Sequence, residues 1–184
     1  MTHSTLRLAQ ICFCAVLLLL AGACSTVDVS QGTHFEATDD IALLPIANHT
    51  ETPDAGHRVQ SIAESLLHQK GFRDLQRYPQ EDATDLLMSG STSRIQQEAL
   101  QWAQDQGIRY ALTGSVQEWR YKVGLDGEPV AGISFKLIDI NEAKVVWSAT
   151  GSRSGWSRSS LSGVGQTLIK TLLEPLTMAP QQRG

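Results

Sequence analysis

The chain is poor in cysteine. It has three in 184 residues, and all of them lie near its beginning, at Cys12, Cys14 and Cys24. The rest of the chain carries no thiol, which excludes a disulfide framework there. We therefore expect packing alone to hold the folded part together.

The chain also lacks a hydrophobic run long enough for a membrane-spanning helix. Its longest uncharged apolar segment covers the thirteen residues 11–23, whereas a span needs about 20 residues. With the positive charge of Arg7 before it, this segment fits the apolar region of a secretory signal. We expect the protein to work outside the cytoplasm.

The residues around Cys24 resemble the cleavage box of bacterial lipoproteins, because Ala21, Gly22 and Ala23 precede the cysteine. The resemblance implies cleavage before Cys24 and a diacylglyceryl group on its sulfur. Several acyl chains, at about 0.8 kcal/mol per buried CH₂, give stable anchoring. Ser25 follows where inner-membrane retention usually requires Asp, so we expect the periplasmic face of the outer membrane. The alternative is an ordinary signal peptide with a chance cysteine.

Positive charge is scarce. After residue 23 the chain has 14 Lys and Arg against 19 Asp and Glu, because the first 23 residues hold one base, Arg7, and no acid. An acidic balance without a basic stripe argues against nucleic acid as a partner. Residues 24–64 hold seven acids and one base, whereas residues 119–184 hold eight bases and five acids. This asymmetry suits a head-to-tail subunit contact or a cationic ligand, although a solvated surface gives the same tally.

Catalytic motifs are missing. Ser115 lies in Gly-Ser-Val, without the second glycine of a nucleophile elbow. No His-Glu-x-x-His motif occurs, and the four histidines after residue 23 are scattered, so only the fold could assemble a zinc site. We expect no enzymatic activity, no metal site and no cofactor apart from the lipid on Cys24.

Hydrophobic periodicity predicts an alternation of strands and helices. Strands are predicted at 41–46, 72–75, 110–121, 130–140 and 145–153, and helices at 53–70, 93–106 and from 161 onwards, with a weak helical patch at 82–88. Thr52 and Pro53 suit the start of the first helix, and Ser159 or Ser160 the cap of the last. The order predicts a single-domain α/β sandwich with a mixed sheet of about five strands and three main helices.

These patterns divide the chain into four parts. We expect a cleaved signal peptide over 1–23, a lipidated tether over 24–40, a periplasmic α/β domain over 41–176 and a flexible tail over 177–184. Pro45 lies near the end of the first strand of the domain. Because proline lacks an N–H donor, the strand pairing should weaken there.

The tryptophans differ in their surroundings. Trp102 and Trp147 lie in apolar patterns that predict core positions, whereas Trp156 lies in a polar loop between Arg153 and Arg158. An exposed tryptophan flanked by bases is typical of an anchor at the membrane interface, with the bases near lipid phosphates. The alternatives are that Trp156 folds back onto the core, or that Trp147 is the exposed aromatic.

Two sets of motifs resemble known families. Residues 41–50, Ile-Ala-Leu-Leu-Pro-Ile-Ala-Asn-His-Thr, followed by a helix, resemble the opening of periplasmic lipoprotein domains with a TolB N-terminal-like fold. Curli-secretion and peptidoglycan-synthase-activator lipoproteins share that shape. The hairpin Gly-Leu-Asp-Gly-Glu-Pro at 124–129 and the loop Ser-Gly-Trp-Ser at 154–157 are similar to the PelC family, the outer-membrane lipoproteins of Pel exopolysaccharide export.

The resemblance to the PelC family implies a homo-oligomeric ring under the outer membrane. The ring would lie at the periplasmic mouth of a PelB-like β-barrel exporter. An acidic face would guide a cationic, partly deacetylated polysaccharide towards the pore, and an aromatic residue of each subunit, here Trp156, would reach the membrane.

The acidic residues proposed to guide the polymer are Asp126 and Glu128 in the hairpin, with Glu51, Asp54 and Glu118 as weaker candidates. Asp126 has a second explanation, because Asp-Gly also suits a turn on backbone grounds alone.

Two other functions remain open from the residues. The protein could be a monomeric lipoprotein that binds and regulates a cell-envelope enzyme. It could also act on cell-wall sugar, although no pair of carboxylates is placed for glycoside hydrolysis. The number of subunits, the chemistry of the polymer and the identity of the barrel do not follow from the sequence.

Overall fold

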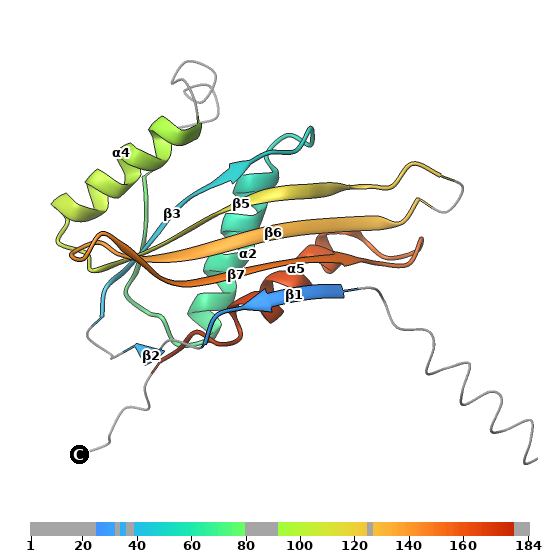
Figure 1. Ribbon diagram of the computed structural model, residues 1–184. Helices are drawn as coiled ribbons and strands as arrows, with labels where there is room; N and C mark the ends of the chain where they lie inside the picture. Colours follow the sequence, from blue (N-terminus) through green and yellow to red (C-terminus); the bar gives the residue numbers. More distant parts are fainter. Residues whose placement is uncertain (1–24, 32–33, 36–38, 80–91, 125–126, 179–184) are drawn as a thin grey trace, which may run out of the picture.

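The computed structural model describes residues 25–31, 34–35, 39–79, 92–124 and 127–178. Its centre is a six-stranded mixed sheet in the order β1-β7-β6-β5-β3-β4 (Figure 1). The strands are β1 Ser25–Val29, β3 Ile41–Asn48, β4 Leu75–Arg77, β5 Tyr110–Tyr121, β6 Pro129–Asp139 and β7 Lys144–Ser154. Strand β3 runs parallel to β4 and β5, and the other neighbours are antiparallel. β2 His34–Phe35 and β8 Thr177–Met178 form a small parallel pair.

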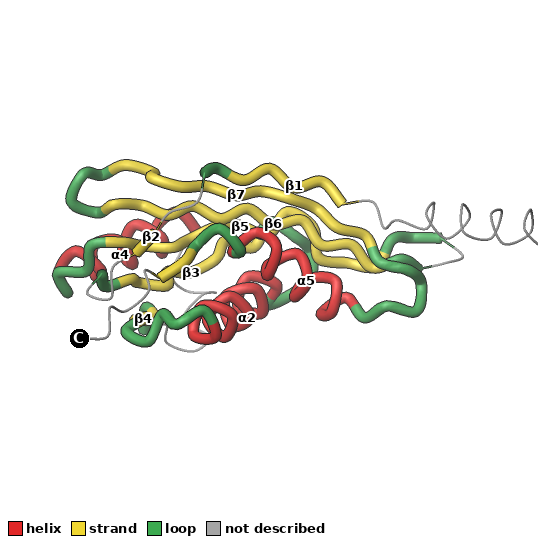
Figure 2. The backbone as a smooth tube through the Cα atoms, turned by 90° about the horizontal axis from the view of Figure 1, so that it is seen from below, coloured by secondary structure: helices red, strands yellow, loops and turns green. Residues whose placement is uncertain are grey.

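Three helices accompany the sheet: α2 Ala55–Gln69, α4 Thr92–Asp105 and α5 Leu161–Leu173. Helices α2 and α5 lie on one face (Figure 2) and cover the larger hydrophobic core. Alternation along β3 explains the second core, because Leu43 belongs to the α2 side while Leu44 packs with Ala99 and Ala103 of α4. The predicted mixed α/β fold with three main helices is confirmed. The helical patch predicted at 82–88 lies outside the described residues.

The sixth strand, β1, lies within the segment expected to be a tether. Val27 and Val29 point inwards and pack against the larger core, while Thr26 and Asp28 are exposed. β1 pairs antiparallel with β7, from Ser25 opposite Arg153 to Val29 opposite Ala149. Two apolar residues among five were too weak a signal for a strand. The expected tail likewise begins with β8, whose partner is β2.

The ends of the helices follow the sequence in part. Ser160 caps α5, because its side-chain oxygen accepts a hydrogen bond from the Gly163 N–H at 3.1 Å. The predicted start of α2 is wrong, since the helix begins at Ala55 after Asp54, whose φ of 59° is left-handed. The hydroxyl of Thr52 donates to the Trp119 carbonyl and is therefore not used as a cap.

Pro45 interrupts the pairing of β3 with β5, as predicted, because the register shifts between Leu43 and Ile46. Two helices supply hydrogen bonds at this irregularity. Gln60 of α2 donates to the Leu44 carbonyl at 3.1 Å. Gln96 of α4 and the hydroxyl of Thr113 both donate to the Pro45 carbonyl, at 3.4 Å and 2.9 Å. The helices therefore hold the bulged strand from its two faces.

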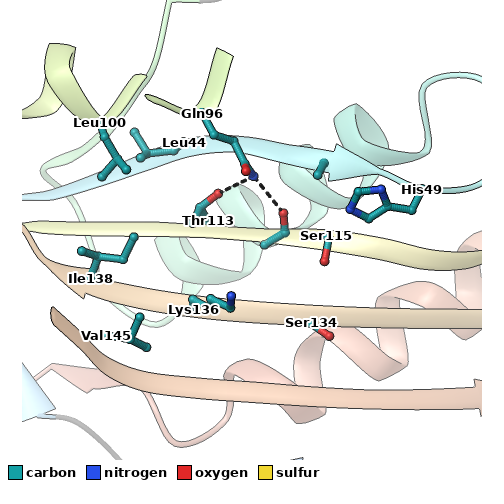
Figure 3. Close-up of a pocket in the computed structure, with 12 residues that line it drawn as sticks. Leu44, His49, Gln96, Leu100, Thr113, Ser115, Ser134, Lys136, Ile138 and Val145 are labelled. Atoms are coloured by element: carbon teal, nitrogen blue, oxygen red, sulfur yellow. Dashed lines mark hydrogen bonds between the residues drawn. The ribbon is translucent and has the colours of Figure 1, made fainter. Parts of the chain in front are cut away.

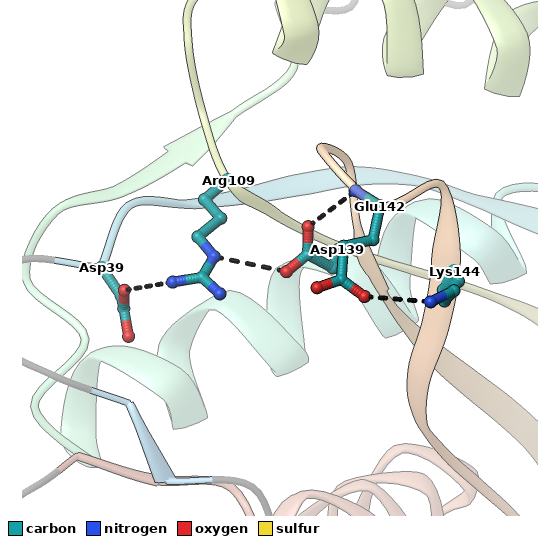
Figure 4. A network of polar contacts seen from close by, with 5 residues as sticks. All are labelled: Asp39, Arg109, Asp139, Glu142 and Lys144. Atoms are coloured by element: carbon teal, nitrogen blue, oxygen red, sulfur yellow. Dashed lines mark hydrogen bonds and ion pairs between the residues drawn. The ribbon is translucent and has the colours of Figure 1, made fainter.

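A polar network ties the loop before β3 to the start of β5 and the end of β6 (Figure 4). The Arg109 guanidinium lies 3.3 Å from the buried Asp139 carboxylate and 3.9 Å from Asp39. Asp139 also accepts the Glu142 backbone N–H at 3.1 Å, which closes the β6–β7 turn. The hydrogen bond to Asp139 raises the pKa of Arg109, so this cation stays charged at any physiological pH.

Helix α5 packs against the sheet through Gly165, which lies directly over the ring of Trp119 in β5. Trp119 is 1% exposed. A methyl group on Gly165 would overlap the outer atoms of the indole ring, so only glycine lets the helix approach this closely.

Candidate functional site

Three segments meet at one end of the sheet: the start of β1, the β5–β6 turn and the β7–α5 loop (Figure 1). The register places Ser25 opposite Arg153 and Tyr121 opposite Pro129. Cys24 itself lies outside the described residues. We call this end of the molecule, where Ser25 begins β1, the β1-start end.

Exposed apolar side chains gather at the β1-start end. Trp156 is 63% exposed, Val123 is fully exposed and Tyr121 is half exposed, whereas Trp119 and Trp147 are buried. Trp156 is thus the exposed tryptophan that the loop composition indicated, and it does not fold back onto the core. The sequence did not point to Val123, because a lone valine beside a turn carries no signal.

The loop that carries Trp156 is fixed by backbone hydrogen bonds. The Gly155 N–H donates to the Pro129 carbonyl at 2.8 Å, and the Ser159 N–H donates to the Trp156 carbonyl at 2.8 Å. The Tyr121 hydroxyl accepts the Leu161 N–H at 3.2 Å. These bonds join the β5–β6 hairpin, the Trp156 loop and α5 into one unit, so the backbone that carries the exposed indole is fixed.

Positive charge accompanies Trp156. Arg153 and Trp156 line a shallow cleft of about 480 Å³ with the first turns of α5, and Arg158 lies two residues further along. Neither arginine forms an ion pair within the part of the chain that the structure describes. Both cations are therefore available to an anionic group outside the domain.

The acidic candidates divide into paired and unpaired residues. Glu128 lies 3.2 Å from the Lys122 ammonium, and Glu118 lies 3.3 Å from Arg120. Glu51 and Asp54 are exposed and form no ion pair among the described residues. Asp126 lies outside the described residues. Among the described acidic candidates, Glu51 and Asp54, two of the three with the weaker sequence signal, are thus the ones without an ion pair.

Acids and bases separate across the sheet at this end. Glu51 and Asp54 follow β3, and the Thr52 hydroxyl joins their loop to the Trp119 carbonyl of β5. Arg153 lies near the end of β7, and Trp156 and Arg158 follow that strand. Because β6 and β5 lie between β7 and β3, Glu51 and Asp54 lie on a different side of the β1-start end from these arginines.

Other kinds of site are absent from the described ranges. No group of three His, Cys, Asp or Glu side chains there could hold a metal ion. Within the same ranges, each helix is too short or too polar to cross a bilayer.

The described strands and helices form one mixed α/β domain. Lipoprotein GNA1162 from Neisseria meningitidis has the same fold, with a TM-score of 0.52 and 17% identity over 74% of this chain and 96% of that chain. No family model matches the sequence, and no curated protein matches it.

Two solved structures are much more similar in sequence. The PelC dodecamer from Paraburkholderia phytofirmans is 44% identical, with a TM-score of 0.72, over 85% of this chain and 100% of that chain. A single-residue variant of the same dodecamer is 45% identical over the same shares, also with a TM-score of 0.72. This chain belongs to the PelC family.

Proposed function

We propose that the protein is an acylated outer-membrane lipoprotein that forms a ring on the periplasmic side. The ring guides a cationic exopolysaccharide of the Pel type into a β-barrel exporter. The observation that carries this proposal is the 44% identity to a PelC dodecamer across the whole of that chain. In this proposal the protein has a non-enzymatic role in polymer export, in keeping with the lack of catalytic motifs.

The arrangement of the β1-start end supports the membrane part of the proposal. Acyl chains on Cys24 would enter the bilayer beside Trp156, and Arg153 and Arg158 would lie near lipid phosphates. Val123 adds a second apolar contact at the same end. The acids on the opposite side of this end then face away from the lipid, where a cationic polymer would pass.

The ring itself is tested by the mass of the acylated protein in mild detergent. A large closed oligomer supports export. A monomer would contradict the ring and favour the regulator of a cell-envelope enzyme. Closed rings require two different complementary surfaces on each subunit, and the uneven distribution of charge along the chain is compatible with such contacts.

Trp156→Ala is expected to weaken membrane binding. Burial of a large apolar side chain contributes about 1.5–3 kcal/mol, so partitioning of the unacylated domain onto anionic vesicles should fall by roughly tenfold or more. The measurement is vesicle co-sedimentation of the domain without its signal segment. Val146→Ala serves as the control. It changes an exposed apolar residue near the beginning of β7, whereas β7 reaches the β1-start end at its other end, at Ser154. Equal binding by both variants and the unaltered domain would contradict the anchor.

Reversal of the acidic side is expected to impair polymer export. Two double variants replace attraction for a cationic polymer by repulsion. One combines Asp126→Lys with Glu128→Lys, and the other combines Glu51→Lys with Asp54→Lys. Secreted polymer is the readout, and the defect should shrink when salt is raised, because the Debye length is about 8 Å at 0.15 M. Glu142→Lys, exposed in the β6–β7 turn, is the matched control. Normal secretion by both double variants would rule out these acids as the guide.

A further inference from the structure

Arg153 continues the inner side of β7 past the end of the hydrophobic core. Alternation along the strand puts Arg153 on the same side as Trp147 and Ala149, which are both buried. Arg153 itself is only partly buried, and it lies beside the first turns of α5. The aliphatic part of an arginine packs well in such a place while its guanidinium stays at the surface. The core therefore ends, at the β1-start end, with a cation.

Arg153 lines the shallow cleft between the β7–α5 loop and α5 (Figure 1), which we call the Arg153 cleft. Its volume of about 480 Å³ lies within the usual range of ligand sites, about 300–1,000 Å³. Trp156 lines it together with hydroxyl-bearing residues, which include Ser159 and Ser160. Gly155 keeps the loop in contact with α5, because a side chain there would overlap a side chain of that helix. The shape of the cleft is therefore set by the packing of the loop on the helix.

The positive charge of the Arg153 cleft is not compensated within the described part of the chain. Arg153 forms no ion pair there, and none of the described residues that line the cleft is acidic. A cation that has lost part of its water without gaining a counter-ion is costly. A bound anion would offset this cost, and a guanidinium matches two oxygens of a phosphate group especially well.

A groove beside α4 also contains a cation, and it provides a comparison (Figure 3). Its volume is about 360 Å³, and Lys136 lines it without an ion pair among the described residues. Lys136 is exposed and lies opposite Ser148, in a part of β7 that precedes Arg153. An ammonium group is a compact point charge without the planar fork of a guanidinium. The groove therefore resembles the Arg153 cleft in charge but not in geometry or in its place in the molecule.

The place of the Arg153 cleft indicates the source of its anion. Arg153 lies opposite Ser25, the residue that follows the candidate acylation site. Trp156, which the proposed function puts in the headgroup region of the bilayer, lines the same cleft. The phosphate groups at that depth belong to phospholipids, so the cleft is positioned to receive a lipid headgroup rather than a dissolved anion.

We propose that the Arg153 cleft binds the headgroup of one anionic phospholipid of the phosphatidylglycerol type. The proposal rests on the membrane contact of the proposed function and adds a selective lipid site to it. Arg153 holds the phosphate, and the hydroxyl groups of Ser159 and Ser160 bind the glycerol of the headgroup. Phosphatidylethanolamine is disfavoured, because its ammonium group would lie beside Arg153 and meet no carboxylate among the described residues of the cleft.

Titration of the acylated protein in uncharged detergent measures this selectivity. The probes are dihexanoyl-phosphatidylglycerol and dihexanoyl-phosphatidylethanolamine, whose chains are too short to form a bilayer. Calorimetry gives the affinity and the number of lipids bound to each chain. We expect saturation at one phosphatidylglycerol for each chain. Phosphatidylethanolamine should bind more weakly by roughly tenfold or more, the usual effect of a hydrogen bond between charged groups.

Arg153→Gln should abolish the preference for phosphatidylglycerol, because the amide keeps a polar side chain in the cleft but removes the charge. Lys136→Gln is the matched control. It removes the same charge from the groove beside α4 and should leave the preference unchanged. Equal losses in the two variants would show attraction by net charge alone and would contradict a site in the Arg153 cleft.

Gly163→Leu tests the cleft without removing a charge. Gly163 lines the cleft at an exposed position of α5, and a Cβ there would meet only the end of the Ser160 side chain. The leucine side chain would fill the cleft, so binding of phosphatidylglycerol should be lost. The variant should unfold at no lower temperature than the unaltered protein. Gln166→Leu, exposed on the same helix and outside the cleft, is the control and should bind normally.

Three results would overturn the proposal. Equal affinity for the two lipids would show that the cleft does not select a headgroup. Normal binding by Gly163→Leu would put the lipid elsewhere on the protein. Displacement of the lipid by inorganic phosphate at a similar concentration would assign the cleft to a free phosphate. Failure of the membrane contact itself is distinguished from these results, because it is measured by vesicle binding of Trp156→Ala and not by this titration.

Discussion

A Cys24→Ala variant is expected to lose all incorporation of labelled fatty acid and to leave the membrane fraction. The sulfur of Cys24 is the attachment point implied by the residues before it, and no other thiol follows in the chain. Each acyl chain contributes about 0.8 kcal/mol per buried CH₂, and one chain alone binds only marginally, so loss of the diacylglyceryl group removes most of the anchoring energy. Trp156 alone cannot replace it.

Metabolic labelling followed by fractionation of the cells measures this effect. Cys14→Ala is the matched control, because it removes a cysteine from the expected signal segment and should leave the label unchanged. Label that persists in Cys24→Ala would show that the protein is not acylated there. A variant that is unlabelled yet still in the membrane fraction would instead assign the anchoring to the exposed side chains of the β1-start end.

Gly165→Ala is expected to lower the free energy of unfolding, because one extra methyl group in a packed core usually costs about 1–3 kcal/mol. The new methyl group would overlap the outer ring atoms of Trp119, which is buried beneath α5. Alanine favours a helix over glycine by roughly 0.8–1 kcal/mol, so the measured loss is what remains after this gain. The helix must move off the sheet or the indole must turn.

Denaturant unfolding of the domain measures this loss. Gly163→Ala, at an exposed position of the same helix, has the same gain in helix propensity, and its new methyl group meets only the end of the Ser160 side chain. It should therefore be clearly more stable than Gly165→Ala. Adding Trp119→Phe to Gly165→Ala should recover part of the loss, because the overlapped ring atoms are absent from phenylalanine. Equal stability of the two alanine variants would show that α5 does not depend on this contact.

Several elements were accessible from the sequence because their signals are local. The β-forming residues of Tyr110–Tyr121 predicted β5 with its observed bounds, and the serine before α5 predicted its cap. Pro45 predicted the irregularity in β3, since a missing N–H disturbs pairing wherever the strand lies. The resemblance of the hairpin and the Trp156 loop led to the PelC family, which the solved structures confirm.

Other features could not be predicted because their cause lies far away in the chain. β1 is a strand because β7 offers a free edge about 120 residues later, not because its own residues prefer that state. The ion pair of Glu128 with Lys122 depends on how the β5–β6 hairpin closes. The exposure of Val123 depends on which other segments pack near the hairpin. Glu51 and Asp54 became stronger candidates for the acidic polymer guide only because the structure shows them without an ion pair among the described residues.

The sequence by itself predicted an export signal and an acylation site, and it determined most of the order of strands and helices, since each of these depends on neighbouring residues. Only the tertiary structure decided that Ser25 and Trp156 lie at one end, and that Glu51 and Asp54 lie beside β3 while Arg153 lies in β7. These features depend on which strands pair and on which side each helix packs. The strand pairing and the side on which each helix packs are set by burial of the whole core, which cannot be predicted from any short segment of the sequence.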